Sequence, residues 1–189
     1  MITKAAGLTD AGCKRQANQD RILVDVERGV FVIADGMGGE RCGELAAETA
    51  VRSVGESLLE AYAPGDPRSS DPVSDVSPKD RVVNAVRCAN QKIWEASEAD
   101  TECAGMGTTL SVALLVASSV VVGNVGDSRV YLFRDAQLRR LTRDDAVVSM
   151  LVDAGKISAE KARVHPMRNV LTLAVGRSRE MRFGLRLGF

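Results

Sequence analysis

Apolar residues recur at helical spacing in two parts of the chain. Steps of four and three positions separate the apolar residues of the first part, which predicts a helix over about 44–61 with one buried face. The same steps predict a second helix over about 80–98. Weaker helical patterns follow over about 144–154 and 158–164. The two strong patterns are set by Ala47, Val51, Val54 and Leu58, then by Val82, Val86, Ala89, Ile93 and Ala96.

Short apolar segments typical of β-strands fill much of the remaining chain. The expected strands are 20–26, 30–35, 108–117, 119–125, 129–133 and 137–141. Short turns join the first pair and the last pair into hairpins. Several strands, among them 30–35, carry apolar residues at odd and at even positions. Both faces of such a strand are expected to be buried against other elements. The order strands, helices, strands, helices therefore predicts an α+β fold, an antiparallel β-sandwich flanked by helices in α-β-β-α layers.

Length and charge narrow the class of protein. The 189 residues suit a single domain, and residues 62–79, which hold four of the five prolines, are expected to form a mobile surface loop. The 25 basic and 25 acidic side chains cancel, so we expect no nucleic-acid partner. No apolar run is long enough to span a membrane, and the N-terminus lacks the layout of a signal peptide, so we expect no membrane association.

The cysteines bear on the compartment. Cys13, Cys42, Cys88 and Cys103 lie far apart in the sequence, and no two form a Cys-x-x-Cys pair. This spacing disfavours a zinc site. We interpret all four as reduced thiols, which is the usual state in the cytoplasm, and place the protein there.

Two aspartates mark the open end of the first expected hairpin. Asp20 begins its first strand and Asp35 ends its second, so position 20 lies opposite position 35 or 36. Facing carboxylates repel each other unless one is protonated or a cation lies between them, and hard oxygen ligands favour Mg²⁺, Mn²⁺ or Ca²⁺. The alternative is that one aspartate caps the turn while the other points to water.

Three further features of the sequence could take part in binding an ion or a phosphate, and each also has a purely structural explanation. The glycines of Asp35-Gly36-Met37-Gly38-Gly39 would let the backbone approach an ion or a phosphate, or form a simple flexible turn. Asp127 lies in a tight turn between strands, where aspartate often only bonds the local backbone. Arg15 could clamp a phosphate through its forked guanidinium or form a surface ion pair.

Six motifs occur in one order along the chain. They are Arg15-x-x-Asn18-Gln19-Asp20, Ala34-Asp35-Gly36-Met37-Gly38-Gly39, Gly43-Glu44, Gly105-Met106-Gly107-Thr108-Thr109, Gly126-Asp127-Ser128-Arg129 and Leu141-Thr142-Arg143-Asp144-Asp145. In this order and spacing the chain resembles the metal-dependent protein phosphatases (the PPM family, or type 2C serine/threonine phosphatases) in their bacterial form. The resemblance extends from about residue 4 to 176. It implies an enzyme that hydrolyses phosphoserine and phosphothreonine in proteins with a metal-activated water.

The resemblance also implies roles for individual residues. Asp35 matches the aspartate that bridges two Mg²⁺ or Mn²⁺ ions, and the carbonyl of Gly36 matches a ligand of one of them. Asp20 matches an aspartate that holds metal-bound water, and Arg15 matches the arginine that binds the substrate phosphate. Asp127, and less directly Asp144, match acidic positions of a third, weaker metal site. The implied partners are a phosphorylated protein substrate and a cognate serine/threonine kinase.

The resemblance breaks near the end of the sequence. It implies two more metal-binding aspartates, in a Ser-Asp-Gly and an Asp-Asn string, and neither string follows residue 176. The alternation over 181–189 predicts a strand for which no later strand exists as a partner. We therefore expect residues 1–189 to be a single phosphatase domain that lacks its C-terminal portion. Two function classes stay open, an active phosphatase or a catalytically impaired domain that binds phosphoproteins.

Overall fold

Within the described residues, a six-stranded antiparallel sheet forms the centre of the protein. The computed structural model describes residues 3–13, 16–59, 76–116, 119–181 and 184–187. The strand order is β1-β2-β4-β5-β8, and β3 pairs with the end of β2. The strands are β1 (Asp20–Asp25), β2 (Val30–Met37), β3 (Gly107–Thr108), β4 (Leu110–Val116), β5 (Ser119–Val125) and β8 (Gly184–Leu187).

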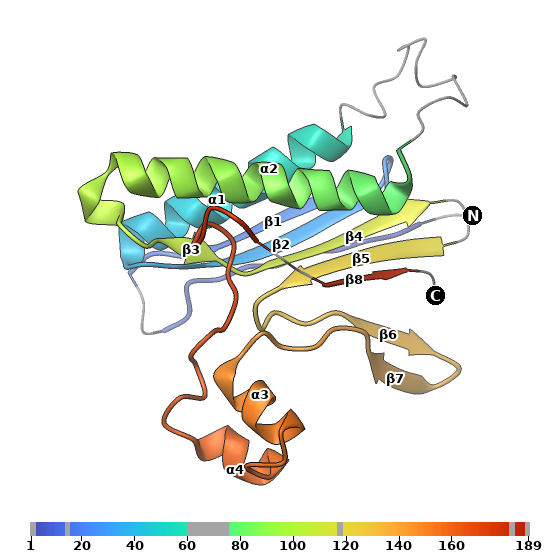
Figure 1. Ribbon diagram of the computed structural model, residues 1–189. Coiled ribbons are helices and arrows are strands. Elements are labelled where there is room, and N and C mark those ends of the chain that lie inside the picture. Colours follow the sequence, from blue (N-terminus) through green and yellow to red (C-terminus); the bar gives the residue numbers. More distant parts are fainter. Residues whose placement is uncertain (1–2, 14–15, 60–75, 117–118, 182–183, 188–189) are drawn as a thin grey trace.

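Two long helices cover one face of this sheet (Figure 1). They are α1 (Glu40–Leu59) and α2 (Pro78–Ala99), and they pack against each other and against β2 and β4. The core lies between helices and sheet, and its largest fully buried side chains include Val32, Val54, Leu58, Ile93 and Leu114. No helix of the described residues is both long and apolar enough to cross a membrane.

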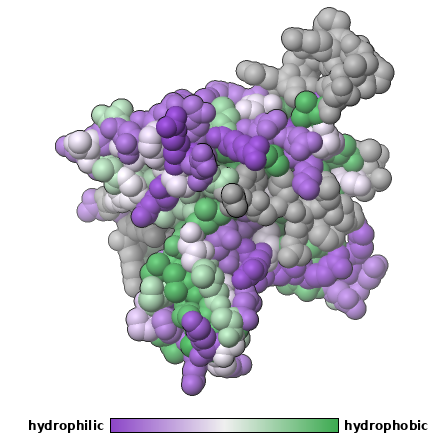
Figure 2. Space-filling view, in the orientation of Figure 1, coloured by the Kyte–Doolittle hydropathy of each residue, from purple (hydrophilic) through white to green (hydrophobic). Residues whose placement is uncertain are grey.

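A smaller lobe lies on the other side of the sheet (Figure 1). It contains the hairpin β6 (Tyr131–Arg134) and β7 (Gln137–Arg140) and the short helices α3 (Val147–Asp153) and α4 (Ala159–Val164). Figure 2 shows apolar side chains gathered over its helical part, where Met150 and Val164 are exposed. After this lobe the chain comes back to the sheet, where Thr108 and Val175 exchange two backbone hydrogen bonds.

The structure confirms the α+β class with antiparallel strands, but not the cover expected on both faces of β2. Val30, Val32 and Ala34 are buried under the helices, whereas Ile33 on the opposite face is 51% exposed. The reason is that the other sheet of the described residues is only the β6–β7 hairpin, and its strands pair solely with each other. Although β2 carries apolar residues on both of its faces, the described part of the chain covers only the face toward the helices.

The observed helices begin earlier than the periodicity predicts. The first helix, expected from about 44, begins at residue 40 because Gly38 and Gly39, with φ of 121° and 88°, end the strand abruptly. The second, expected from about 80, begins at Pro78, since Ser77 caps it by accepting a hydrogen bond from the Asp80 amide.

This start corrects the loop prediction for 62–79. Residues 78 and 79 belong to α2, because proline suits the first helical turn, where its missing N–H has no partner to lose. The part of the predicted loop from 62 to 75 lies outside the described residues.

The strand expected over 181–189 is present as β8, and it pairs with an earlier strand, β5, with Leu187 opposite Val121. The expectation for the cysteines is wrong for two of the four. Cys42 and Cys103 are not reduced thiols but form a disulfide, while Cys13 and Cys88 are free. The two half-cystines are 61 positions apart in sequence, but the start of α1 and the turn after α2 meet in space with a Cα–Cα distance of 5.3 Å.

Candidate functional site

Asp20 and Asp35 face each other across the β1–β2 hairpin. They are register partners at its open end, which is one of the two pairings that the turn length predicted. Asp35 is exposed and Asp20 is half-buried. The side chains of directly opposed residues leave the same face of a sheet with Cβ atoms about 4.5–5.5 Å apart. This end of the hairpin therefore presents two carboxylates on one face.

Thr109, which lies between β3 and β4, holds the backbone of Asp35 through both its amide and its carbonyl. The Asp35 amide donates to Thr109 Oγ1 at 3.0 Å, and the Thr109 amide donates to the Asp35 carbonyl at 2.9 Å. Thr109 Oγ1 also shares a 2.7 Å hydrogen bond with Ser128 Oγ, next to Asp127. These bonds connect the turn that carries Asp127 to the strand end that carries Asp35. The sequence motif contained Thr109, but its spacing gave no sign of this role.

The glycine string after Asp35 is held against the first turn of α1. A Cβ added at Gly36 would lie 1.8 Å from the Gly43 carbonyl oxygen, so the two backbones touch. Buried Gln19 secures both ends of the string, because its carbonyl accepts from the Gly36 amide and its side-chain amide donates to the Gly39 carbonyl at 2.6 Å. The string is thus a built backbone surface rather than a flexible turn.

Asp35, Gly36 and Asp127 line one cleft. Its volume is about 800 Å³, and its other wall is residues 169–174 with Arg177 and Ser178. Arg177 is the one basic residue of this lining in the described part of the chain, and its side chain packs on Gly107. Sequence reasoning assigned Arg177 no role in a site, and only its position after the Val175-Gly176 turn could have suggested one.

Asp144 lies elsewhere, in an ion pair with Arg129. The Arg129 guanidinium donates to both carboxylate oxygens, with Nη2 2.6 Å from Oδ2 and Nε 3.0 Å from Oδ1, and Arg140 approaches to 3.6 Å. This pairing raises the pKa of Arg129 above its already high ordinary value. Asp144 does not line the cleft of Asp35, although Asp127 borders both that cleft and the arginine-rich one that contains Asp144.

Asp145 fixes the turn that presents Asp127. Its Oδ2 accepts from the Gly126 amide at 3.0 Å, and its own amide donates to the Gly126 carbonyl at 2.9 Å. Burial raises the pKa of the Asp145 carboxyl, while the Gly126 amide acts against that rise. Gly126 itself has a φ of 94° and packs on Thr109, so the turn is defined from both sides.

The oxygen donors at the open end of the hairpin suit a hard cation, and of these Asp35 and Gly36, but not Asp20, line the cleft. The described residues contain no group of three or more histidine, cysteine, aspartate or glutamate side chains placed to hold a metal. They do offer the opposed carboxylates of Asp20 and Asp35 and the peptide of Gly36, and such oxygen donors match Mg²⁺ and Mn²⁺. Arg15, the expected phosphate ligand, lies outside the described residues.

Comparisons with known proteins agree with this geometry. Residues 13–163 match the family model described as protein phosphatase 2C. Protein phosphatase PhpP of Streptococcus pneumoniae is 34% identical over 177 residues, which cover 92% of this chain and 68% of the relative. The crystal structure of the Mycobacterium tuberculosis serine/threonine phosphatase PstP/Ppp superposes with a TM-score of 0.78 at 32% identity, covering 95% of this chain and 70% of that one.

A third comparison includes metal. The catalytic domain of the serine/threonine protein phosphatase PstP, described as a complex with two manganese ions, superposes with a TM-score of 0.76 at 29% identity, covering 95% of this chain and 69% of that one. The fold, the paired aspartates and these relatives together define a class, the protein phosphatases. This chain belongs to the protein phosphatase 2C (PPM) family of serine/threonine phosphatases, in its bacterial form.

Proposed function

We propose that this protein hydrolyses phosphoserine and phosphothreonine monoesters in other proteins, with Mg²⁺ or Mn²⁺ held by Asp20, Asp35 and the Gly36 carbonyl. The observation that carries the proposal is the register pairing of Asp20 with Asp35. This pairing puts two carboxylates on the same face of the sheet. Next to them lies the backbone of Gly36, where α1 leaves no room for a side chain. The proposal covers two ions, and a third, weaker one near Asp127.

The cation supplies a water of lowered pKa and positive charge for the phosphate oxygens. The residues of the chain would hold the cation and orient the substrate phosphate. Thr109 fixes the Asp35 backbone through two hydrogen bonds, so the carboxylate is positioned before any ligand arrives. We assign binding of the substrate phosphate to Arg15 through its forked guanidinium. Arg177 lines the cleft on the wall opposite Asp35. We leave Asp144 as an alternative contributor to the weaker metal site.

The cleft supports a protein substrate. Asp35 and Asp127 are both exposed, so a phosphorylated side chain on another protein's surface can reach them. We propose that residues 1–189 form the larger part of one phosphatase domain, without its C-terminal portion. We further propose that it works in the cytoplasm on proteins phosphorylated by a cognate serine/threonine kinase. The alternative of a domain that binds phosphoproteins without turnover is not favoured, because the relatives are named as phosphatases.

Replacing Asp35 tests the proposal. Asp35→Asn keeps the shape but removes the charge, so calorimetry should detect Mn²⁺ binding to the native protein and not to the variant. The variant should also release phosphate from a phosphothreonine peptide more slowly than the native protein. Asp135→Asn is the matched control, because Asp135 lies in the β6–β7 turn with a φ of 53°, which asparagine tolerates. Equal Mn²⁺ affinity of the native protein and Asp35→Asn would refute the proposed site.

A further inference from the structure

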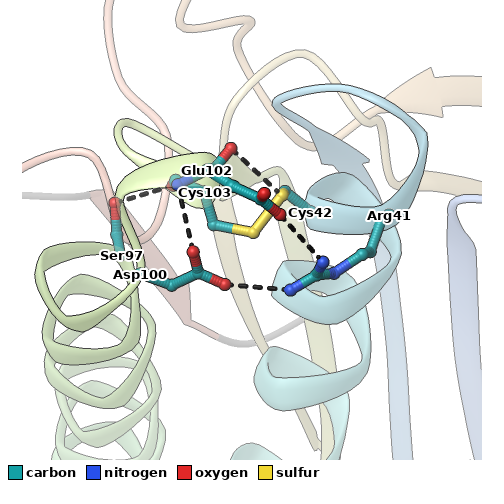
Figure 3. Close-up of polar contacts among 6 residues, drawn as sticks. All are labelled: Arg41, Cys42, Ser97, Asp100, Glu102 and Cys103. Atoms are coloured by element: carbon teal, nitrogen blue, oxygen red, sulfur yellow. Dashed lines mark hydrogen bonds and ion pairs between the residues drawn. A yellow bond between two sulfur atoms is a disulfide. The ribbon is translucent and has the colours of Figure 1, made fainter.

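The Cys42–Cys103 disulfide joins two segments that both touch the glycine string after Asp35. Cys42 lies in the first turn of α1, and Cys103 ends the short 3₁₀ helix η2 (Thr101–Cys103) that follows α2. Figure 3 shows the bond bridging these two elements, with Arg41 and Asp100 beside it. Because 61 positions separate the two cysteines in sequence, the bond is a long-range connection and not a local turn.

On the Cys42 side, the disulfide sits next to the backbone that supports Gly36. Gly43 follows Cys42 directly, and its carbonyl oxygen is the atom that a Cβ on Gly36 would strike at 1.8 Å. The Gly43 amide also donates to the Gly39 carbonyl at 2.9 Å. The first turn of α1, which carries Cys42 and Gly43, therefore forms one wall beside the glycine string.

On the Cys103 side, the support comes through Met106. The Met106 amide donates to the Cys103 carbonyl at 3.0 Å, and Met106 Cα lies 2.9 Å from the position that a Cβ on Gly38 would occupy. Ser97 holds the same turn, donating to the Cys103 carbonyl and accepting from the Gly105 amide. The glycine string thus lies between two walls, and the S–S bond connects those walls.

The ion pairs that link the two walls are weak. Arg41 reaches Asp100 at 2.9 Å and Glu102 at 3.1 Å (Figure 3), but the Arg41 side chain is 69% exposed. Exposed ion pairs contribute little to stability and are screened by salt. The disulfide therefore adds a covalent link, which salt does not screen, to the packing of α1 on α2.

We propose that Cys42 and Cys103 are a redox-modification site, and that their disulfide clamps the backbone around Gly36. The co-reactant is a dithiol reductant. One of its thiolates attacks Cys42 Sγ and breaks the S–S bond, whose electron pair leaves on Cys103 Sγ and takes up a proton. The second thiol then attacks the mixed disulfide, releases Cys42 as a thiol and closes the reagent's own disulfide. Two electrons and two protons pass to the protein.

The surroundings fit a reversible reaction of this kind. Cys42 is 7% exposed and Cys103 is 1% exposed, so attack enters at Cys42. The thiol formed there has an acceptor in place, since the Glu102 carbonyl oxygen lies 3.6 Å from Cys42 Sγ. Buried cysteine is well tolerated as a small apolar side chain, so the reduced form remains folded. Disulfides of proteins that work in a reducing compartment are usually catalytic or redox-sensing.

The clamp has a consequence for the metal site, and this part rests on the proposed function. Loosening the walls on reduction should weaken Mn²⁺ binding about tenfold, within the usual range of coupling between sites. Coupling is reciprocal, so saturating Mn²⁺ should make the disulfide harder to reduce by the same factor. For this two-electron couple, a tenfold change is about 30 mV in reduction potential.

The test compares the native protein before and after reduction with dithiothreitol, together with Cys42→Ser/Cys103→Ser. Hydrogen exchange should become at least about tenfold faster at 36–43 and 103–108 in both clamp-free forms, because local opening becomes easier. Calorimetry should give the weaker Mn²⁺ affinity for the same two forms. Cys88→Ser is the matched control, since Cys88 is a free cysteine on α2, and it should behave as the native protein.

The outcomes separate the two proposals. Faster exchange at 36–43 with no Mn²⁺ binding to any form supports the clamp and refutes the proposed metal site. Mn²⁺ binding with the same affinity and the same exchange in oxidised and reduced protein refutes the clamp and leaves the metal site standing. Two additional thiols titrated in the native protein without reductant would show that the bond does not form, and would also refute the clamp.

Discussion

The carbonyl oxygen of Gly43 lies 1.8 Å from the point where any residue other than glycine would place a Cβ at position 36. Position 36 follows the paired Asp35, so a close backbone contact of α1 with the sheet occurs next to the candidate metal ligands. Backbone atoms on both sides leave no movable side chain to relieve an overlap. This contact sets the separation between the glycine string and α1.

Gly36→Ala should therefore lower the free energy of unfolding by about 2–4 kcal/mol, because the added methyl must push strand and helix apart. Urea unfolding measures the change. Gly55→Ala is the control, because its Cβ would meet only the flexible end of Leu23 at 2.9 Å and alanine favours the helix. Equal stabilities of the two variants would contradict the assigned contact.

Asp144→Asn should destabilise the protein whether or not Mn²⁺ is present. The Asp144 side chain is only 10% exposed, and its loss removes the charged partner of Arg129. Because Arg129 is 47% exposed and water can replace that partner, the cost should be about 0.5–1 kcal/mol. A thermal shift measured with and without Mn²⁺ gives the comparison. A loss confined to the Mn²⁺ sample would instead support Asp144 as a ligand of the weaker metal site.

Local patterns predicted the scaffold of the site well. The expected turn length put position 20 opposite 35 or 36, and the structure pairs Asp20 with Asp35. The strands are separated by residues 26–29, one more residue than the longest turn expected, and the register still falls within that prediction. Helical spacing likewise located the buried faces of α1 and α2. Such features depend on residues close in sequence, so periodicity reports them directly.

Contacts between distant segments were not predictable in the same way. The Cys42–Cys103 bond and the hydrogen bonds of Asp35 with Thr109 join residues 61 and 74 positions apart. Nothing in the spacing of cysteines reveals which elements meet in space. The role of Asp144 was not predictable either. Its ion pair with Arg129 forms only because the segment after β5, which carries Arg129, folds back against the segment after β7, which carries Asp144.

Arg177→Ala should raise KM for a phosphothreonine peptide several-fold, while Mn²⁺ affinity stays unchanged. Arg177 lines the cleft opposite Asp35 and Asp127, where a guanidinium can bind phosphate oxygens in the ground state. Steady-state kinetics and calorimetry provide the two readouts. Arg52→Ala on the exposed surface of α1 is the matched control for loss of one positive charge. An unchanged KM would remove Arg177 from substrate binding.

The turn between β1 and β2 should make stability depend on pH through Asp25. The Arg28 amide donates to Asp25 Oδ1 at 2.8 Å and its guanidinium donates to Oδ2 at 3.0 Å. The amide hydrogen bond is the main cause that lowers the pKa of the Asp25 carboxyl below its ordinary value of 3.8, against a smaller opposing effect of burial. A carboxyl with a lowered pKa in the folded state stabilises above its unfolded pKa, and this stabilisation is lost as pH falls through the folded value.

Asp25→Asn should therefore cost about 1 kcal/mol of unfolding free energy at pH 7. The difference from the native protein should stay constant down to about pH 4 and shrink below it, because protonation then removes the same charge from the native side chain. Urea unfolding at a series of pH values from 7 to the acid limit of folding provides the measurement. Glu27→Gln is the control, since Glu27 is exposed in the same turn and its change should alter stability little at any pH. A difference that persists unchanged well below pH 4 would mean that the Asp25 charge does not stabilise this turn.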